Sequence, residues 1–222
     1  PPVERLDGAH NRAYGHGTMI AGLIAHIAPD ARILPVRVLD ADGVGSTSGV
    51  LAGLRFALRN GARVVNMSFS TTAKSDLLEE ALDAAEEAGV LIVAAAGNDG
   101  AERRHYPAAY SHVLSVAALA PDDRKAAFSS YGSHVRLSAP GIAIRSAFAG
   151  GEYASWSGSS FATPLVAAAA ARLLEQEGRL EPDEVVERLR RTARPIDPLN
   201  PDYDGRLGAG LLDVAAALAP QN

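Results

Sequence analysis

Apolar residues recur along residues 16–115 in two alternating patterns. In some segments they lie three and four positions apart, as at Ile20, Leu23 and Ile27, which is the spacing of an amphipathic helix. Other segments are short apolar runs, such as residues 90–96, which are typical of strands buried on both faces of a sheet. Helices and strands that alternate in this way predict consecutive βαβ units and a parallel sheet with crossover helices.

The same patterns predict where the individual elements lie. Strands are expected at residues 33–39, 62–67, 90–96, 113–118 and 135–138, and helices at residues 16–27, 51–58, 77–88, 159–177, 183–191 and 211–218. Pro164 lies close to the start of the longest helix, where we expect it to be tolerated because first-turn N–H groups have no intrahelical partner. Residues 194–206 contain three prolines and are followed by only 16 residues, so we interpret them as a surface loop.

Composition narrows the class of protein. With 222 residues, 47% of them hydrophobic and 21% charged, we expect a single domain over residues 1–222 with a substantial core. The net charge of −5 predicts no nucleic-acid partner, and the absence of cysteine excludes disulfides and thiolate chemistry. The longest apolar stretch, residues 165–171, is too short to span a membrane, and the first residues do not resemble a signal peptide.

Three segments place a reactive or hydrogen-bonding side chain beside glycine at a predicted junction between elements, where open α/β sheets bind ligands. They are residues 15–18 with His16, residues 94–100 with Asn98, and residues 157–164 with Ser159 and Ser160. Taken singly, each has a structural interpretation. An asparagine tolerates positive φ in a turn, and a serine before a helix is a common N-cap.

The order of the motifs favours chemistry. Gly-His-Gly-Thr at residues 15–18, Asn-Met-Ser at 66–68, Ala-Ala-Gly-Asn at 95–98 and Gly-Ser-Ser-Phe-Ala-Thr-Pro at 158–164 together resemble the subtilisin-like serine proteases, the subtilases of peptidase family S8. Connecting segments extend the resemblance over most of residues 15–215. It implies an α/β fold, a three-layer sandwich whose central sheet is mostly parallel and has helices on both faces.

The resemblance also implies roles for individual residues. Ser160 would be the nucleophile, with Ser159 at the position of the family's threonine, and His16 would be the general base. Asn98 would donate to the oxyanion together with the Ser160 backbone N–H. The polypeptide substrate would bind as an extended strand along two segments, Gly43, Val44 and Gly45 on one side and Ser68, Phe69 and Ser70 on the other. A propeptide or an inhibitor is a further partner that the resemblance allows.

The sequence departs from the family pattern in one major respect. The family has its catalytic aspartate at the end of a strand well before the histidine, whereas only 15 residues precede His16, and Asp7 is better interpreted as a turn residue. We expect a peptidase domain that is incomplete at its N-terminus, with the aspartate upstream. The alternative is a catalytically impaired pseudoprotease or a peptide-binding module.

Smaller departures concern metals and specificity. The chain is short between Ile24 and Ala31, where many relatives carry a calcium-binding insertion, so we expect no metal site and no cofactor. Ser70 and Thr71 replace the family's usual Gly-Gly pair, so the cleavage preference does not follow from the resemblance. Secretion is expected by resemblance alone.

Overall fold

The computed structural model describes residues 13–220, which are arranged around a parallel sheet. Its four strands are β1 (Val64–Met67), β2 (Leu91–Ala95), β3 (Val113–Leu119) and β4 (Leu137–Pro140), in that spatial order. The register pairs Val64 with Leu91, Ile92 with Val113, and Val116 with Leu137. Because all four strands are parallel, their carboxyl ends meet at one edge of the sheet, which is where such sheets bind ligands.

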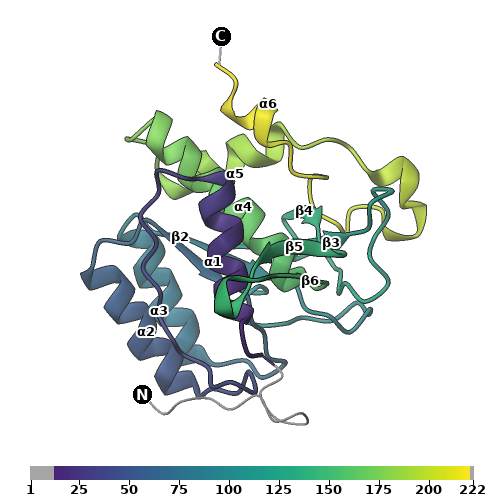
Figure 1. Ribbon diagram of the computed structural model, residues 1–222. Helices are drawn as coiled ribbons and strands as arrows, with labels where there is room; N and C mark the ends of the chain where they lie inside the picture. The colour runs from purple at the N-terminus through teal and green to yellow at the C-terminus, as the bar shows by residue number, and fades with distance from the viewer. Residues whose placement is uncertain (1–12, 221–222) are drawn as a thin grey trace.

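Helices cover both faces of this sheet (Figure 1). Alternate residues of β2 point to opposite faces, as the two-residue period of a strand requires. Leu91 and Val93 pack toward α4 (Ser159–Gln176), whereas Ile92 and Ala94 pack toward α2 (Thr47–Arg59) and α3 (Asp76–Glu87). The predicted three-layer α/β sandwich is therefore confirmed.

The helix α4 is buried on nearly all sides because it lies between the sheet and a further helix, α1 (His16–Ile27). It contacts all four strands, and α5 (Pro182–Arg191) and α6 (Val214–Leu218) pack beside it (Figure 1). Alanines at residues 167–170 are at most 3% exposed and let the helix lie close to the sheet. An apolar surface all round is what a central helix needs.

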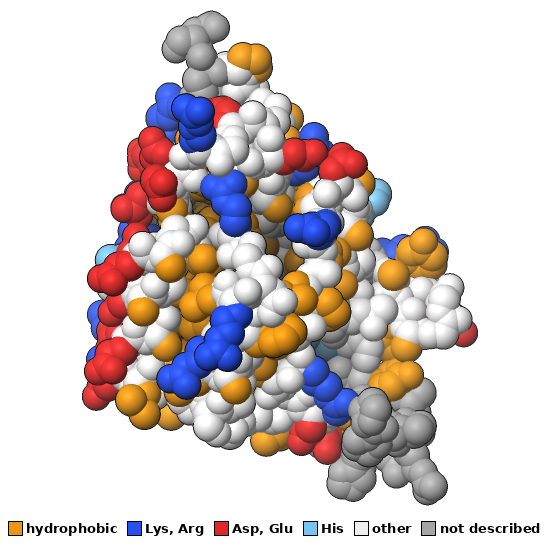
Figure 2. Space-filling view, turned by 90° about the vertical axis from the view of Figure 1, so that its left-hand side faces the viewer, with side chains coloured by type: hydrophobic (Ala, Val, Ile, Leu, Met, Phe, Trp, Pro, Cys, Tyr) orange, Lys and Arg blue, Asp and Glu red, His pale blue; other side chains and the backbone are white. Residues whose placement is uncertain are grey.

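The predicted strand at residues 33–39 is wrong. This segment runs extended, but within residues 13–220 it forms no strand ladder, and Ile33 and Leu34 are 38% and 40% exposed. Val36 and Val38 pack instead against α2, where a Cβ on Gly53 would lie 2.4 Å from the nearer valine. A strand requires a neighbouring edge, and in the described part of the chain nothing pairs with the outer edge of β1 either. Figure 2 views the α2 and α3 side and shows hydrophobic side chains reaching the surface across it.

Other boundaries differ from the predicted ones for local reasons. A hairpin of β5 (Ile144–Ala147) and β6 (Tyr153–Trp156) was not predicted. The last helix begins at Val214 rather than at residue 211, because Leu211 pairs with Arg194 and Ser138, and the Asp213 side chain caps the helix. The loop at residues 194–206 contains only the short 3₁₀ turns η2 (Asp197–Leu199) and η3 (Pro201–Tyr203), and η1 (Ala149–Gly151) lies in the β5–β6 connection.

Of the helices within residues 13–220, none is long and apolar enough to cross a membrane.

Candidate active site

His16 is the first residue of α1 and lies in an aromatic setting. Its ring centroid is 5.4 Å from that of Phe161 in an edge-to-face arrangement and 6.4 Å from that of Trp156. Burial lowers the pKa of His16 below its ordinary value of 6.5, because an apolar environment disfavours the imidazolium. A neutral imidazole is the form that can accept a proton.

The glycines on either side of His16 differ in their surroundings. Gly15 has φ of 80°, and a Cβ there would lie 2.2 Å from the Phe148 ring, so this glycine is required by packing and backbone conformation. Nothing lies within 4 Å of a Cβ on Gly17. Only Gly17 therefore leaves open space beside the imidazole.

Asn98 follows the carboxyl end of β2, and its amide orientation is fixed by Ser159. The Ser159 backbone N–H donates to Asn98 Oδ1 over 2.9 Å, and the Ser159 hydroxyl lies 2.9 Å from the same oxygen. A backbone N–H needs an acceptor, so the atom that faces Ser159 must be the amide oxygen. The Asn98 Nδ2 group therefore points the other way, and it lies 3.6 Å from where a Gly158 Cβ would be.

Ser160 is the second residue of α4 and is half-buried. Its backbone N–H belongs to the first turn, where no intrahelical acceptor exists, and within residues 13–220 no other acceptor is hydrogen-bonded to it. This N–H and the Asn98 amide thus bracket the start of α4, at the positive end of the helix dipole.

The predicted first-turn location of Pro164 is wrong, and the difference matters for Ser160. Pro164 is the sixth residue of α4, so the N–H that would bond to the Ser160 carbonyl four residues earlier is missing. The Ser68 hydroxyl donates to that carbonyl instead, over 2.8 Å. Ser68 also accepts a hydrogen bond from Asn66 Nδ2 over 2.9 Å, which links β1 to the start of α4.

The two segments predicted to bind substrate differ in how much of their backbone is free. Within the described chain, no hydrogen bond to another element uses the backbone of Ser68, Phe69 or Ser70. In the other segment, Val44 bonds to Asp40 through both its N–H and its carbonyl, and its side chain is 64% exposed. Only the glycines on either side of Val44 keep backbone groups available there.

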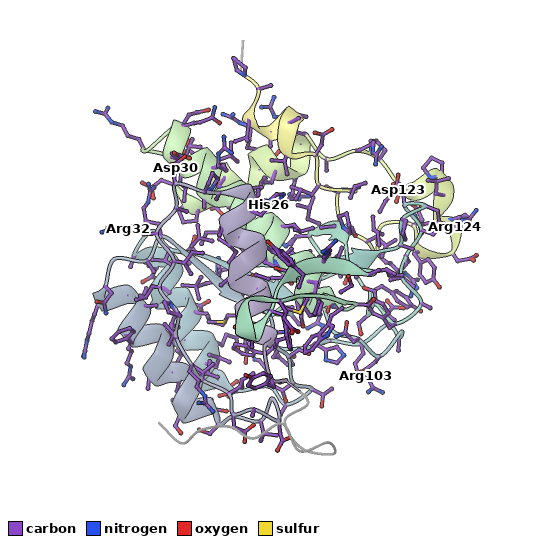
Figure 3. The ribbon with its side chains drawn as sticks, in the orientation of Figure 1. His26, Asp30, Arg32, Arg103, Asp123 and Arg124 are labelled. Atoms are coloured by element: carbon purple, nitrogen blue, oxygen red, sulfur yellow. The ribbon has the colours of Figure 1, made fainter. Side chains whose placement is uncertain are left out.

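The carboxylate of Asp99 lies in the same turn as Asn98. Asp99 Oδ2 is 2.9 Å from Arg103 Nη1 and 3.1 Å from Nε2 of His105 (Arg103 is labelled in Figure 3). The His105 ring is buried against Gly97, where a Cβ would lie 2.4 Å away. His105 therefore supports the turn that carries Asn98.

No carboxylate partner for His16 is present in the described chain. Within residues 13–220, no side chain forms a hydrogen bond or an ion pair with its imidazole. Asp7 lies outside the described residues. The structure thus brings His16, Asn98 and Ser160 to one end of the sheet without showing an acidic group that orients the histidine.

An α/β sandwich that carries a serine, a histidine and an asparagine at the carboxyl edge of its sheet has residue types there that serine hydrolases use. The chain belongs to the subtilase family, because the family model Peptidase_S8, described as the subtilase family, matches residues 5–210.

Known relatives and solved structures agree with this family. The chain is 40% identical over 188 residues to a thermostable alkaline protease of Halalkalibacterium halodurans, covering 81% of this chain and 52% of that protein. It is 38% identical to subtilisin BL of Lederbergia lenta, covering 91% and 77% respectively. A cold-adapted subtilisin-like serine proteinase superposes with a TM-score of 0.84 at 35% identity, covering 94% of this chain and 76% of that one. The chain thus spans about half the length of the first of these relatives.

Sequence reasoning missed several residues that shape this site. Asn66 was assigned only to a motif and Ser68 to the same motif and to a substrate-binding segment, but their link to the Ser160 carbonyl was not foreseen. The signal was present in Pro164, since a proline inside a helix frees a carbonyl four residues earlier that must find another donor. The aromatic neighbours Phe161 and Trp156 had no such signal, because only the packing of α4, β6 and α1 brings them to His16.

Proposed function

We propose that this chain is the peptidase domain of a serine endopeptidase that hydrolyses peptide bonds through an acyl-enzyme on Ser160. His16 takes the Ser160 hydroxyl proton as the oxygen bonds to the peptide carbonyl carbon, and then returns it to the departing amine. In the second half of the reaction, His16 takes a proton from a water molecule as the water oxygen bonds to the acyl carbon. The bond to Ser160 then breaks, the proton returns to the Ser160 oxygen, and the carboxylic acid product is released. No metal or cofactor takes part in these steps.

The oxyanion-binding arrangement carries this proposal. A tetrahedral intermediate on Ser160 places its negative oxygen beside the Ser160 backbone N–H and Asn98 Nδ2, two donors without another acceptor in the described chain. Because Ser159 holds the Asn98 oxygen, the amide does not have to rotate before it donates. Donors that are aligned in advance stabilise a developing charge without reorganisation.

The free backbone after β1 supports a peptide substrate. We infer that an extended polypeptide pairs with Ser68, Phe69 and Ser70, and that Gly43 and Gly45 with the exposed Val44 contact it from the other side. By resemblance, we propose that the enzyme acts outside the cytoplasm as a secreted protein.

We propose that the acid that orients His16 comes from a segment outside the described residues. Three observations support the outer edge of β1 as its place. This edge is unpaired in the described chain, the neighbouring segment at residues 33–39 has no ladder, and Asn66 Oδ1 on β1 is buried without a hydrogen-bond partner. One added parallel strand between β1 and residues 33–39 would pair with both edges and end near His16.

The imidazole of His16, which has no hydrogen-bond or ion-pair partner within residues 13–220, also favours a second candidate, a peptide-binding protein that is catalytically silent. Without an orienting carboxylate the imidazole loses tautomer control, and loss of that group alone costs about 3 × 10⁴ in kcat, a value established for subtilisin, a member of the same family. In this case the free backbone of residues 68–70 binds peptide, and the peptide is released intact.

Covalent labelling with a fluorophosphonate, read by intact mass, separates the two candidates. We expect one adduct per chain, absent in Ser160→Ala, either in this chain or in one extended upstream. An adduct that forms only in the extended chain places the acid in the added segment. Folded protein that stays unlabelled in both forms contradicts the endopeptidase and leaves the peptide-binding protein.

A further inference from the structure

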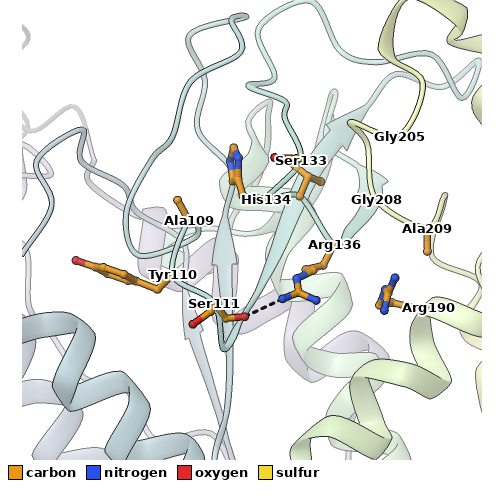
Figure 4. A pocket seen from close by; sticks show the side chains of 11 residues that line it. Ala109, Tyr110, Ser111, Ser133, His134, Arg136, Arg190, Gly205, Gly208 and Ala209 are labelled. Atoms are coloured by element: carbon orange, nitrogen blue, oxygen red, sulfur yellow. Dashed lines mark hydrogen bonds between the residues drawn. The ribbon is translucent and has the colours of Figure 1, made fainter. Parts of the chain in front are cut away.

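A cavity lies at the opposite edge of the sheet from Ser160. It has a volume of about 330 Å³ and is formed by the loops that lead into the amino ends of β3 and β4, together with α5 and the segment before α6 (Figure 4). Three basic side chains line it, those of His134, Arg136 and Arg190, and no acidic residue of the described chain does.

Both arginines have donors to spare. Arg136 Nη2 donates to the Ser111 carbonyl over 2.8 Å, which holds its guanidinium in the cavity wall and leaves its other N–H groups without a partner in the described chain (Figure 4). Arg190 reaches the cavity from α5, and its Nε is buried with no hydrogen-bond partner among residues 13–220. Buried polar groups in folded proteins are nearly always paired, so an unpaired buried donor indicates a missing acceptor.

Positive charge in this region is poorly neutralised. The carboxylate that pairs with Arg190 belongs to Glu187, which is 66% exposed and contacts only Nη1, at 3.5 Å. Burial lowers the pKa of His134, and the charge of the nearby Arg104 lowers it further, while Glu102 opposes these effects. The side chains around the cavity therefore favour an anion over another cation.

We propose that this cavity binds a small oxyanion of the inorganic phosphate or sulfate class, held between Arg136 and Arg190. A guanidinium presents several N–H groups in one plane, which suits two oxygens of the same anion. The hydroxyl of Ser133, which also lines the cavity, supplies a further donor.

Such an anion would join three parts of the fold that are distant in sequence. Arg190 belongs to α5, Arg136 precedes β4, and Gly205, Gly208 and Ala209 close the cavity from the C-terminal segment. A ligand that binds only the folded state raises its stability with ligand concentration. This site is thus a stabilising one, separate from the proposed peptidase chemistry.

The test is thermal unfolding of the Ser160→Ala chain, which cannot digest itself, in rising sodium phosphate at constant ionic strength. We expect the Tm to rise with phosphate but not with the sodium chloride that replaces it. A sulfate series and a citrate series distinguish a site for tetrahedral oxyanions from one that accepts carboxylates. A Tm that is the same in phosphate as in sodium chloride at the same ionic strength would overturn the proposal.

Matched variants locate the effect. Arg190→Gln removes a side chain whose ion pair within the described residues, with Glu187, is on the surface, so we expect a folded protein that loses most of the phosphate-dependent Tm shift. We expect Arg136→Gln to lose most of the phosphate-dependent Tm shift as well. If Arg136→Gln folds poorly, the result for Arg190→Gln is used alone to test the site. Arg32→Gln removes an exposed arginine that does not line the cavity (Figure 3), and it should keep the full shift. An Arg190→Gln chain that responds like the parent refutes the site.

Discussion

The hydrogen bond from Ser68 to the Ser160 carbonyl gives a quantitative prediction. Replacing Ser68 with alanine removes the hydroxyl that donates to that carbonyl, and Pro164 has no N–H that could take its place. It also removes the acceptor for Asn66 Nδ2. Leaving a buried polar group unpaired costs about 1–3 kcal/mol, and since both groups are only partly buried we expect about 1–3 kcal/mol in total for Ser68→Ala.

Pro164→Ala supplies the matched second change. It restores an N–H four residues after Ser160, which can form the ordinary helical hydrogen bond to the same carbonyl. In the parent chain this bond adds little because Ser68 already donates. In the Ser68→Ala chain it replaces the lost donor, so we expect the double variant to recover about 1 kcal/mol relative to the sum of the single effects.

The free energies come from urea unfolding of all four chains in a Ser160→Ala background, where no proteolysis disturbs the equilibrium. The single tryptophan, Trp156, lies beside Phe161 and reports the loss of structure near the site. The cavity left by the proline ring and its effect on the unfolded chain are common to both backgrounds and cancel in the cycle. Additive effects, with a coupling below about 0.3 kcal/mol, would refute this explanation of how the Ser160 turn is held.

Three further predictions concern the site. In steady-state kinetics, Asn98→Ala should lower kcat about 10²–10³-fold, which is the loss known for this donor in subtilisin itself. Asn98→Asp should lower kcat by a similar factor, because a carboxylate cannot donate a hydrogen bond to the oxyanion. Gly15→Ala should lower the free energy of unfolding by about 1–3 kcal/mol through the contact with Phe148 and the positive φ, whereas Gly17→Ala in urea titrations should not. In Ser160→Ala the His16 pKa measured by NMR should lie below 6.5. Stability should then fall as pH drops from about 6.5 toward that lowered pKa, because over this range the unfolded chain takes up a proton that the folded chain resists. A carboxylate against the ring would instead raise that pKa.

The sequence by itself determined the sheet and its main helices. Strands such as residues 90–96 and helices such as residues 77–88 carry their period in the apolar positions, and burial in the fold simply satisfies that pattern. The order of the motifs around His16, Asn98 and Ser160 was likewise enough to predict the family. These features are local, or depend only on order along the chain.

The tertiary structure decided what depends on a partner distant in sequence. Residues 33–39 have the composition of a strand but no ladder, because hydrogen bonding needs a neighbouring edge that the described chain does not supply. Asn98 was recognisable as an amide in a turn, but only the Ser159 N–H decides which of its two ends faces the start of α4. The proline in α4 was visible in the sequence. The donor to the carbonyl that it frees is Ser68, which lies 92 residues from Ser160, and only the packed fold brings the two together.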